Sequence, residues 1–122
     1  MSVDPRPEDF ARYLAEDDGQ PVYMLNLLRY KPDGGRERYA EYAAATGPFL
    51  AAVGGEVVHA GDCSTLVVGP DEHRWDAILV VRYPSRAAMG EMVANPEYLE
   101  VSKIRSEALD AAVLQATSSW MG

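Results

Sequence analysis

Two apolar runs, Val22 to Tyr30 and Trp75 to Tyr83, constrain the fold more than any other feature of the sequence. Both are rich in aliphatic and aromatic residues, and both end at turn signals that contain proline, as strands commonly do. Because apolar residues are nearly continuous along them, we expect each run to be a central strand that is buried within a sheet. The rest of the chain must therefore supply the neighbouring strands and the layers that cover them.

Segments with helical periodicity lie before, between and after these runs. Gly47-Pro48 interrupts one such segment, and because proline lacks the amide donor we expect a kink or a break near Thr46. Asp4-Pro5 and Asn95-Pro96 each pair a capping residue with a proline suited to a first helical turn. The helices are expected from Asp4-Pro5 to Asp17, from Arg36 to Val53, from Ser85 to Asn95, and from Glu97 through Leu109.

Further strands complete the pattern. Glu56 to Gly61 is expected as a strand, which Ser64 to Val68 either continues past a bulge or follows as a short extra strand; the last strand starts at Ala112 and runs on toward Trp120. The order is a helix followed by β-α-β-β-α-β, which predicts an α+β, ferredoxin-like fold with an antiparallel sheet and helices on one face. We expect one domain overall, with residues 1–20 as an N-terminal helical extension and residues 21–122 as the ferredoxin-like part.

Helices on one face of this sheet would leave its other face bare, and the central strands would make that face apolar. A large exposed apolar patch marks an interaction surface in soluble proteins. In a chain this short, the simplest cover is a second copy of the same sheet, which predicts an isologous homodimer.

Composition argues against several classes of partner. The 122 residues carry a formal charge of −8, which disfavours nucleic acid and anionic lipid because both are bound largely through Lys and Arg. No apolar run approaches the roughly 18 to 20 residues that span a bilayer, and the first residues are acidic where a signal peptide is basic. Cys63, the single cysteine, allows neither an intrachain disulfide nor a thiolate metal cluster. We expect a cytoplasmic protein that binds no nucleic acid, membrane or metal.

Several segments of the chain resemble, in order, the domain of unknown function 1330 family. They are Pro21-Val-Tyr-Met-Leu-Asn-Leu-Leu-Arg-Tyr, Tyr39-Ala-Glu-Tyr, Gly54-Gly-Glu-Val-Val, Val81-Arg-Tyr-Pro-Ser-Arg-Ala-Ala and Asn95-Pro-Glu-Tyr, followed by Arg105. The resemblance covers roughly residues 20 to 118. It implies a dimeric α/β barrel, in a superfamily that includes cofactor-free monooxygenases, muconolactone isomerases and haem-handling enzymes. Haem-handling members would place a histidine on a helix, and neither histidine here is expected on one, so the sequence predicts no cofactor.

Polar side chains within apolar segments are the first candidates for a site, because a buried polar group must be satisfied by a partner. Asn26 lies in the middle of the first strand, where it either orients a ligand or bonds to neighbouring backbone. The spacing of Arg105 from Tyr98 turns it toward the apolar face of its helix, where a guanidinium needs a carboxylate or an anionic ligand. Asp76 and Glu97 are the candidate internal partners of Arg105. Tyr98 shares this face, as a hydroxyl donor or as core filler.

The remaining candidates lie on the second and third strands. His59 could carry protons near neutral pH, or it could be a surface or dimer-contact residue. Arg82 ends a strand just before Ser85, where the start of the following helix offers free amides to an anion. His73 lies in an acidic turn without the spacing of a metal site, and a solvated turn is expected there.

These observations predict a small-molecule enzyme without cofactor, monooxygenase-like or isomerase-like, with its substrate between the sheet and the helices. The alternatives are a non-catalytic module that binds a metabolite or a protein, and a closed core in which the polar groups pair among themselves. The predicted catalytic residues are His59 and Arg105, and the predicted substrate-binding residues are Asn26, Arg82, Tyr98 and Ser85.

Overall fold

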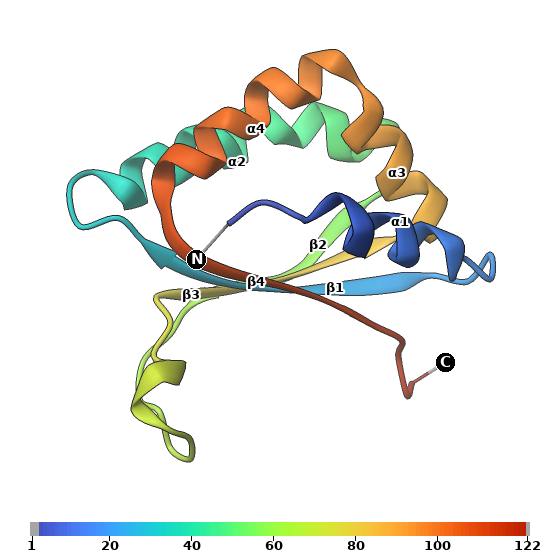
Figure 1. The fold of residues 1–122 in the computed structure, drawn as a ribbon. Coiled ribbons are helices and arrows are strands. Elements are labelled where there is room, and N and C mark those ends of the chain that lie inside the picture. Colours follow the sequence, from blue (N-terminus) through green and yellow to red (C-terminus); the bar gives the residue numbers. More distant parts are fainter. Residues whose placement is uncertain (1–2, 122) are drawn as a thin grey trace.

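The two apolar runs form the centre of a four-stranded sheet with the strand order β2-β3-β1-β4. All neighbouring strands are antiparallel, and the fold is shown in Figure 1 as a computed structural model that describes residues 3–121. Every strand of the expected β-α-β-β-α-β pattern is present. The strands are β1 (Val22–Tyr30), β2 (Glu56–Asp62), β3 (Ala77–Tyr83) and β4 (Leu109–Thr117).

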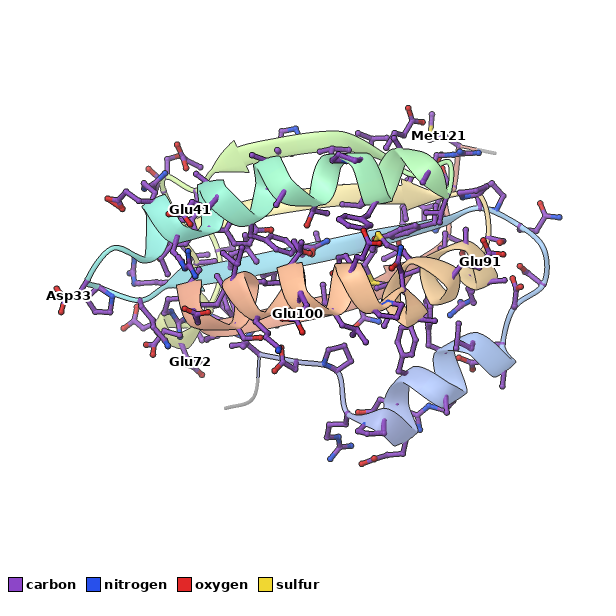
Figure 2. The ribbon with its side chains drawn as sticks, turned by 90° about the horizontal axis from the view of Figure 1, so that it is seen from above. Asp33, Glu41, Glu72, Glu91, Glu100 and Met121 are labelled. Atoms are coloured by element: carbon purple, nitrogen blue, oxygen red, sulfur yellow. The ribbon has the colours of Figure 1, made fainter. Side chains whose placement is uncertain are left out.

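The helices lie on one face of this sheet (Figure 1). They are α1 (Pro7–Ala15), α2 (Gly35–Ala52), α3 (Arg86–Ala94) and α4 (Pro96–Ala108), with a short 3₁₀ turn, η1 (Asp71–His73), between β2 and β3. Seen from above, α2 and α4 run side by side over the strands, while α1 lies outside α3 and α4 (Figure 2). The ferredoxin-like α+β fold with an extra N-terminal helix is therefore confirmed.

Alternation along β1 separates a covered face of the sheet from a bare one. Val22, Met24, Asn26 and Leu28 are buried and face the helices, whereas the residues between them face the other way. Residues that pair across antiparallel strands share a face, so the register extends this division across the sheet. The bare face carries Leu25, Leu27, Ile78, Val80 and Val113. None of the four described α-helices lies over it, although the loop that contains η1 projects on this side at one end of the sheet (Figure 1).

The expected interruption of α2 does not occur as a break. The helix continues from Gly35 to Ala52 with Pro48 inside it. Gly47 has no Cβ to clash with the proline ring, which removes part of the usual penalty on the residue before a proline. Loss of one amide donor in an eighteen-residue helix is then outweighed by the packing of α2 against α4.

Several expected boundaries were wrong. The last strand runs from Leu109 to Thr117, whereas it was expected from Ala112 toward Trp120. The segment 64–70 forms no strand, because β2 and β3 stop pairing at Asp62 and Ala77 and leave it no partner; Val67 and Val68 are 85% and 89% exposed. Helix α1 begins at Pro7 with Arg6 in the extended N-cap position. Asp4 was expected to cap this helix, but its carboxylate instead accepts a hydrogen bond from Ser106 of α4.

Gly35 allows the start of α2 to approach the junction of α4 and β4. A Cβ at this position would lie 2.6 Å from the carbonyl oxygen of Ala108, which is backbone and cannot move aside alone. We predict that Gly35→Ala lowers the free energy of unfolding by about 1–3 kcal/mol, measured by urea denaturation. Gly90→Ala is the matched control, because its Cβ would meet only the flexible end of Leu14 at 2.9 Å. Equal stabilities for the two variants would contradict this view of the packing.

Candidate functional site

A cavity of about 350 Å³ lies between the helices and the covered face of the sheet. All four α-helices and three of the four strands contribute to its wall. Its apolar wall includes Met24, Phe10, Met89, Met92, Val93, Leu99 and Leu114, together with Pro5 and Pro7. Its polar wall is formed by Asp4, Asn26, Tyr42, Tyr83, Tyr98, Ser102 and Arg105.

Arg105 brings a buried positive charge to this cavity. It lies in the last turn of α4, where the helix dipole favours a cation, and its side chain is 8% exposed. Its Nη1 donates to the carbonyl oxygen of Val3 at 2.6 Å, and the nearest carboxylate oxygen, Oδ1 of Asp4, is 3.9 Å away. Within residues 3–121, its Nη2 is buried and has no hydrogen-bond partner.

Neither of the expected internal carboxylates pairs with Arg105. Asp76 instead accepts a hydrogen bond from the backbone amide of Tyr30, and Glu97 belongs to the capped first turn of α4, where Asn95 accepts from its amide. The closed core in which Arg105 is fully paired with a carboxylate is therefore not what the structure contains.

Tyr98 lines the same cavity as Arg105 and is held by a second tyrosine. The hydroxyl groups of Tyr42 and Tyr98 are 2.8 Å apart, and the ring of Tyr98 meets Phe49 edge to face. Burial is the main cause that raises the pKa of Tyr98 and of Tyr83 well above the usual range of tyrosine. Both phenols are therefore protonated at neutral pH, and each has one hydrogen to donate. In the Tyr42–Tyr98 pair either hydroxyl can be the donor, and when Tyr42 donates, the hydrogen of Tyr98 is free for a ligand.

Asn26 is buried on the cavity side of β1. Its Nδ2 donates to the backbone carbonyl of Met24 at 3.0 Å, which fixes the orientation of the amide. Asn26 pairs with Leu79 and Leu114 on the neighbouring strands, so apolar residues surround it on both sides. The two uses expected for Asn26 are thus compatible, since it bonds to backbone and also lines the cavity.

The structure does not bring His59, Arg82 and Ser85 to this cavity. His59 pairs with Val80 and Arg82 pairs with Tyr23, so both side chains belong to the bare face of the sheet. Ser85 caps α3, and its hydroxyl accepts the amide of Ala88 at 3.1 Å. Of the six predicted site residues, Asn26, Tyr98 and Arg105 share the cavity and these three lie elsewhere.

Two parts of the site were not predicted from the sequence. Tyr42 is buried in α2, and its pairing with Tyr98 depends on how α2 packs against α4. The contact of Val3 with Arg105 is made by a backbone carbonyl, and no pattern of side chains in the sequence predicts it. Tyrosine at a buried helical position is the one signal that pointed toward the tyrosine pair.

Within residues 3–121, no group of three or more His, Cys, Asp or Glu side chains is placed to hold a metal ion. In the same part of the chain, no helix is both long and apolar enough to cross a bilayer. The cavity offers instead a guanidinium and neutral phenols facing an apolar space. This arrangement suits a negatively charged oxygen, which receives charge-assisted hydrogen bonds there.

Comparison with known proteins places the chain among proteins of this architecture. The family model for domain of unknown function 1330 (DUF1330) matches residues 23–117. The crystal structure of RPA0582, a protein of unknown function from Rhodopseudomonas palustris, is 36% identical, with a TM-score of 0.88 and 95% of each chain covered. No protein with a curated description matches the chain significantly.

More distant structures share the fold alone. A dimeric ferredoxin-like protein of unknown function from Jannaschia sp. CCS1 is 12% identical, with a TM-score of 0.63 over 81% of this chain and 99% of that one. The hydroxynitrile lyase from Passiflora edulis is 17% identical, with a TM-score of 0.63 over 81% and 93% of the two chains. Proteins of this fold thus include dimers and an enzyme.

The buried tyrosines predict a loss of stability in alkali. Burial raises the pKa of Tyr13 to about 12 and that of Tyr98 further, so above about pH 10 the unfolded chain releases protons that the folded chain keeps. The contribution of these buried phenols to the free energy of unfolding is complete below about pH 10. It is lost as pH rises toward the raised pKa values of the folded protein. We predict a free energy of unfolding in urea that falls from about pH 9 to about pH 11, and falls less steeply in Tyr98→Phe. Reversible ionisation of all seven tyrosines near their ordinary pKa in the folded protein, followed by ultraviolet absorbance, would contradict this.

Proposed function

The chain belongs to the domain of unknown function 1330 (DUF1330) family, and from this premise we propose that it is a cofactor-independent enzyme that binds a small organic anion. The anion lies in the cavity between the sheet and the helices. The observation that carries this proposal is the guanidinium of Arg105, which is buried beside the cavity with Nη2 unpartnered among residues 3–121.

A buried cation supports an anionic ligand for energetic reasons. Removing a guanidinium from water costs several kcal/mol unless an anion and hydrogen bonds compensate it. In the described part of the chain, Arg105 donates its hydrogen bond to a neutral carbonyl, that of Val3. A ligand carboxylate at Nη2 would supply the missing hydrogen bond and a negative charge closer than that of Asp4, whose carboxylate oxygen is 3.9 Å from Nη1.

The rest of the wall limits the body of the ligand. The volume of about 350 Å³ is near the lower end of ligand pockets, which span roughly 300–1,000 Å³. Methionine side chains from β1 and α3 line it and adapt to irregular apolar shapes. We therefore propose a compact substrate with an apolar or aromatic body and one anionic end.

The chemistry proposed follows from where charge develops. Isomerisation next to a carbonyl, and reaction of an activated substrate with dioxygen, both begin when a base takes a proton from carbon and leaves an enolate whose oxygen carries negative charge. In the described cavity wall, Asp4 is the carboxylate that would take this proton. Tyr98, neutral and oriented by Tyr42, and Arg105 are donors that stabilise such an oxygen better than they stabilise a neutral carbonyl. This difference favours an isomerase-like or monooxygenase-like reaction without a cofactor.

A non-catalytic binding module is the second candidate, and the position of His59 favours it. His59 was the expected proton carrier, yet it lies on the opposite face of the sheet from Arg105 and Tyr98. Under this alternative the cavity binds the same anion and releases it unchanged. Mass spectrometry of ligands recovered after incubation with the protein distinguishes the two candidates.

Benzoate is a suitable probe, because it combines a compact apolar body with one carboxylate. We predict that Arg105→Met, which keeps apolar volume but removes the charge, weakens benzoate binding by about tenfold or more, as expected for loss of a charge-assisted hydrogen bond. Arg38→Met is the control, because Arg38 pairs with Glu41 and Glu107 on the surface. Isothermal titration calorimetry measures both. If the two variants bound benzoate with equal affinity, Arg105 would not be part of the anion site.

We also propose that the protein is a homodimer joined through the bare face of the sheet. Leu25, Leu27, Ile78, Val80 and Val113 form an apolar surface there, and ferredoxin-like structural neighbours are dimeric. A second copy would cover this surface by an isologous contact.

Val80→Asp places a charge in the middle of that surface and should convert the dimer to a monomer, which sedimentation velocity at micromolar concentration detects. Val67→Asp is the control, because Val67 is exposed on the loop between β2 and β3. Circular dichroism checks that both variants fold. A wild-type protein that sediments as a monomer would exclude this interface.

A further inference from the structure

The segment that precedes α1, residues 3–6, lies against the end of α4 where Arg105 is found. We call this segment the N-terminal arm. It runs from beside the junction of α4 and β4 toward α1 (Figure 1). Among its contacts, the carbonyl oxygen of Val3 accepts from Nη1 of Arg105 at 2.6 Å, and Oδ1 of Asp4 accepts from Oγ of Ser106 at 2.6 Å. The side chain of Val3 also packs against the core.

We infer that the N-terminal arm is an intramolecular competitor for the anion site and must release Arg105 when a ligand carboxylate binds. This inference rests on the proposed function, because it concerns the same guanidinium. The arm presents to Arg105 the groups that an organic acid would present, namely a carbonyl oxygen and, 3.9 Å away, a carboxylate oxygen. It also lines the cavity through Asp4 and Pro5.

The strengths of the two kinds of contact favour displacement. A carbonyl is a neutral acceptor, whereas a ligand carboxylate is charged and can accept from both terminal nitrogens of a guanidinium. Among residues 3–121, Nη2 of Arg105 has no partner while the arm is in place, so the arm leaves the buried cation incompletely satisfied. A carboxylate that reached both nitrogens would correct this deficit.

Residues 4–6 of the arm are exposed and weakly attached, whereas Val3 packs against the core. Asp4, Pro5 and Arg6 are exposed, and the Asp4 side chain remains 61% exposed even where it approaches Arg105. The hydrogen bond between Asp4 and Ser106 is exposed and contributes little, because water replaces it when it opens. The bond from Arg105 to Val3 is part-buried, and it is the contact that a ligand carboxylate must replace. Arm release and ligand binding are therefore coupled. A substitution that weakens the contacts of the arm must raise the affinity for the ligand by the same factor.

The test uses Ser106→Ala, which removes the donor to Asp4 while leaving Arg105 and the cavity wall intact. Lys103→Ala is the matched control on the same helix, because Lys103 pairs with Glu100 on the surface and lies outside the cavity wall. We expect benzoate to bind Ser106→Ala about fivefold more tightly than wild type, the lower end of common coupling strengths, and Lys103→Ala with unchanged affinity. Calorimetry on the full chain measures all three.

Hydrogen exchange supplies a second measurement that does not depend on the variant. In the wild-type protein, saturating benzoate should speed exchange in the N-terminal peptide that contains the arm. Benzoate binding that depends on Arg105 but is unchanged in Ser106→Ala, with unchanged exchange in the arm, overturns the competition and leaves the proposed function intact. Weaker binding in Ser106→Ala overturns it too, since the arm would then close over the ligand. No benzoate binding by wild type or Ser106→Ala overturns both.

Discussion

A positive charge buried at the end of α4 is the constraint on which the site depends. Arg105 is placed there by the apolar face of its helix, and the helix dipole makes the position tolerable for a cation. Its described surroundings satisfy it only in part, because its ion pair with the exposed Asp4 is long, at 3.9 Å, and, within residues 3–121, one terminal nitrogen has no acceptor. Because this buried cation is incompletely satisfied, binding of an anion in the adjacent cavity is favourable.

The two faces of the sheet divide the functions of the molecule. Residues of β1 that face the helices enclose the cavity, while the residues between them build an apolar surface that we assign to a second copy. Because the side chains of one strand alternate, a single apolar run supplies both surfaces. Mutations on one face should therefore separate binding from assembly.

Much of the fold follows from the sequence, because hydrophobic periodicity and turn residues are local signals. The central strands, the order of elements and the buried position of Arg105 all follow from such patterns. Face assignments on β2 do not, because the register shifts between Val57 and His59. Val57 shares a face with Val81, and without that shift His59 would face the helices; one extra residue turns it to the bare side. The contact of the Val3 carbonyl with Arg105 is equally hidden, because side-chain patterns do not encode backbone acceptors.

The most direct test of this account is a proton–nitrogen correlation spectrum of the guanidinium group of Arg105, recorded while benzoate is added. Comparison with Arg105→Met assigns the signal. The account predicts that the Arg105 signal shifts in a saturable way, at the same benzoate concentration that alters the signals of Tyr98 and Asn26. An Arg105 signal that stays in place while benzoate binds elsewhere on the protein would contradict the assignment of this cavity as the anion site.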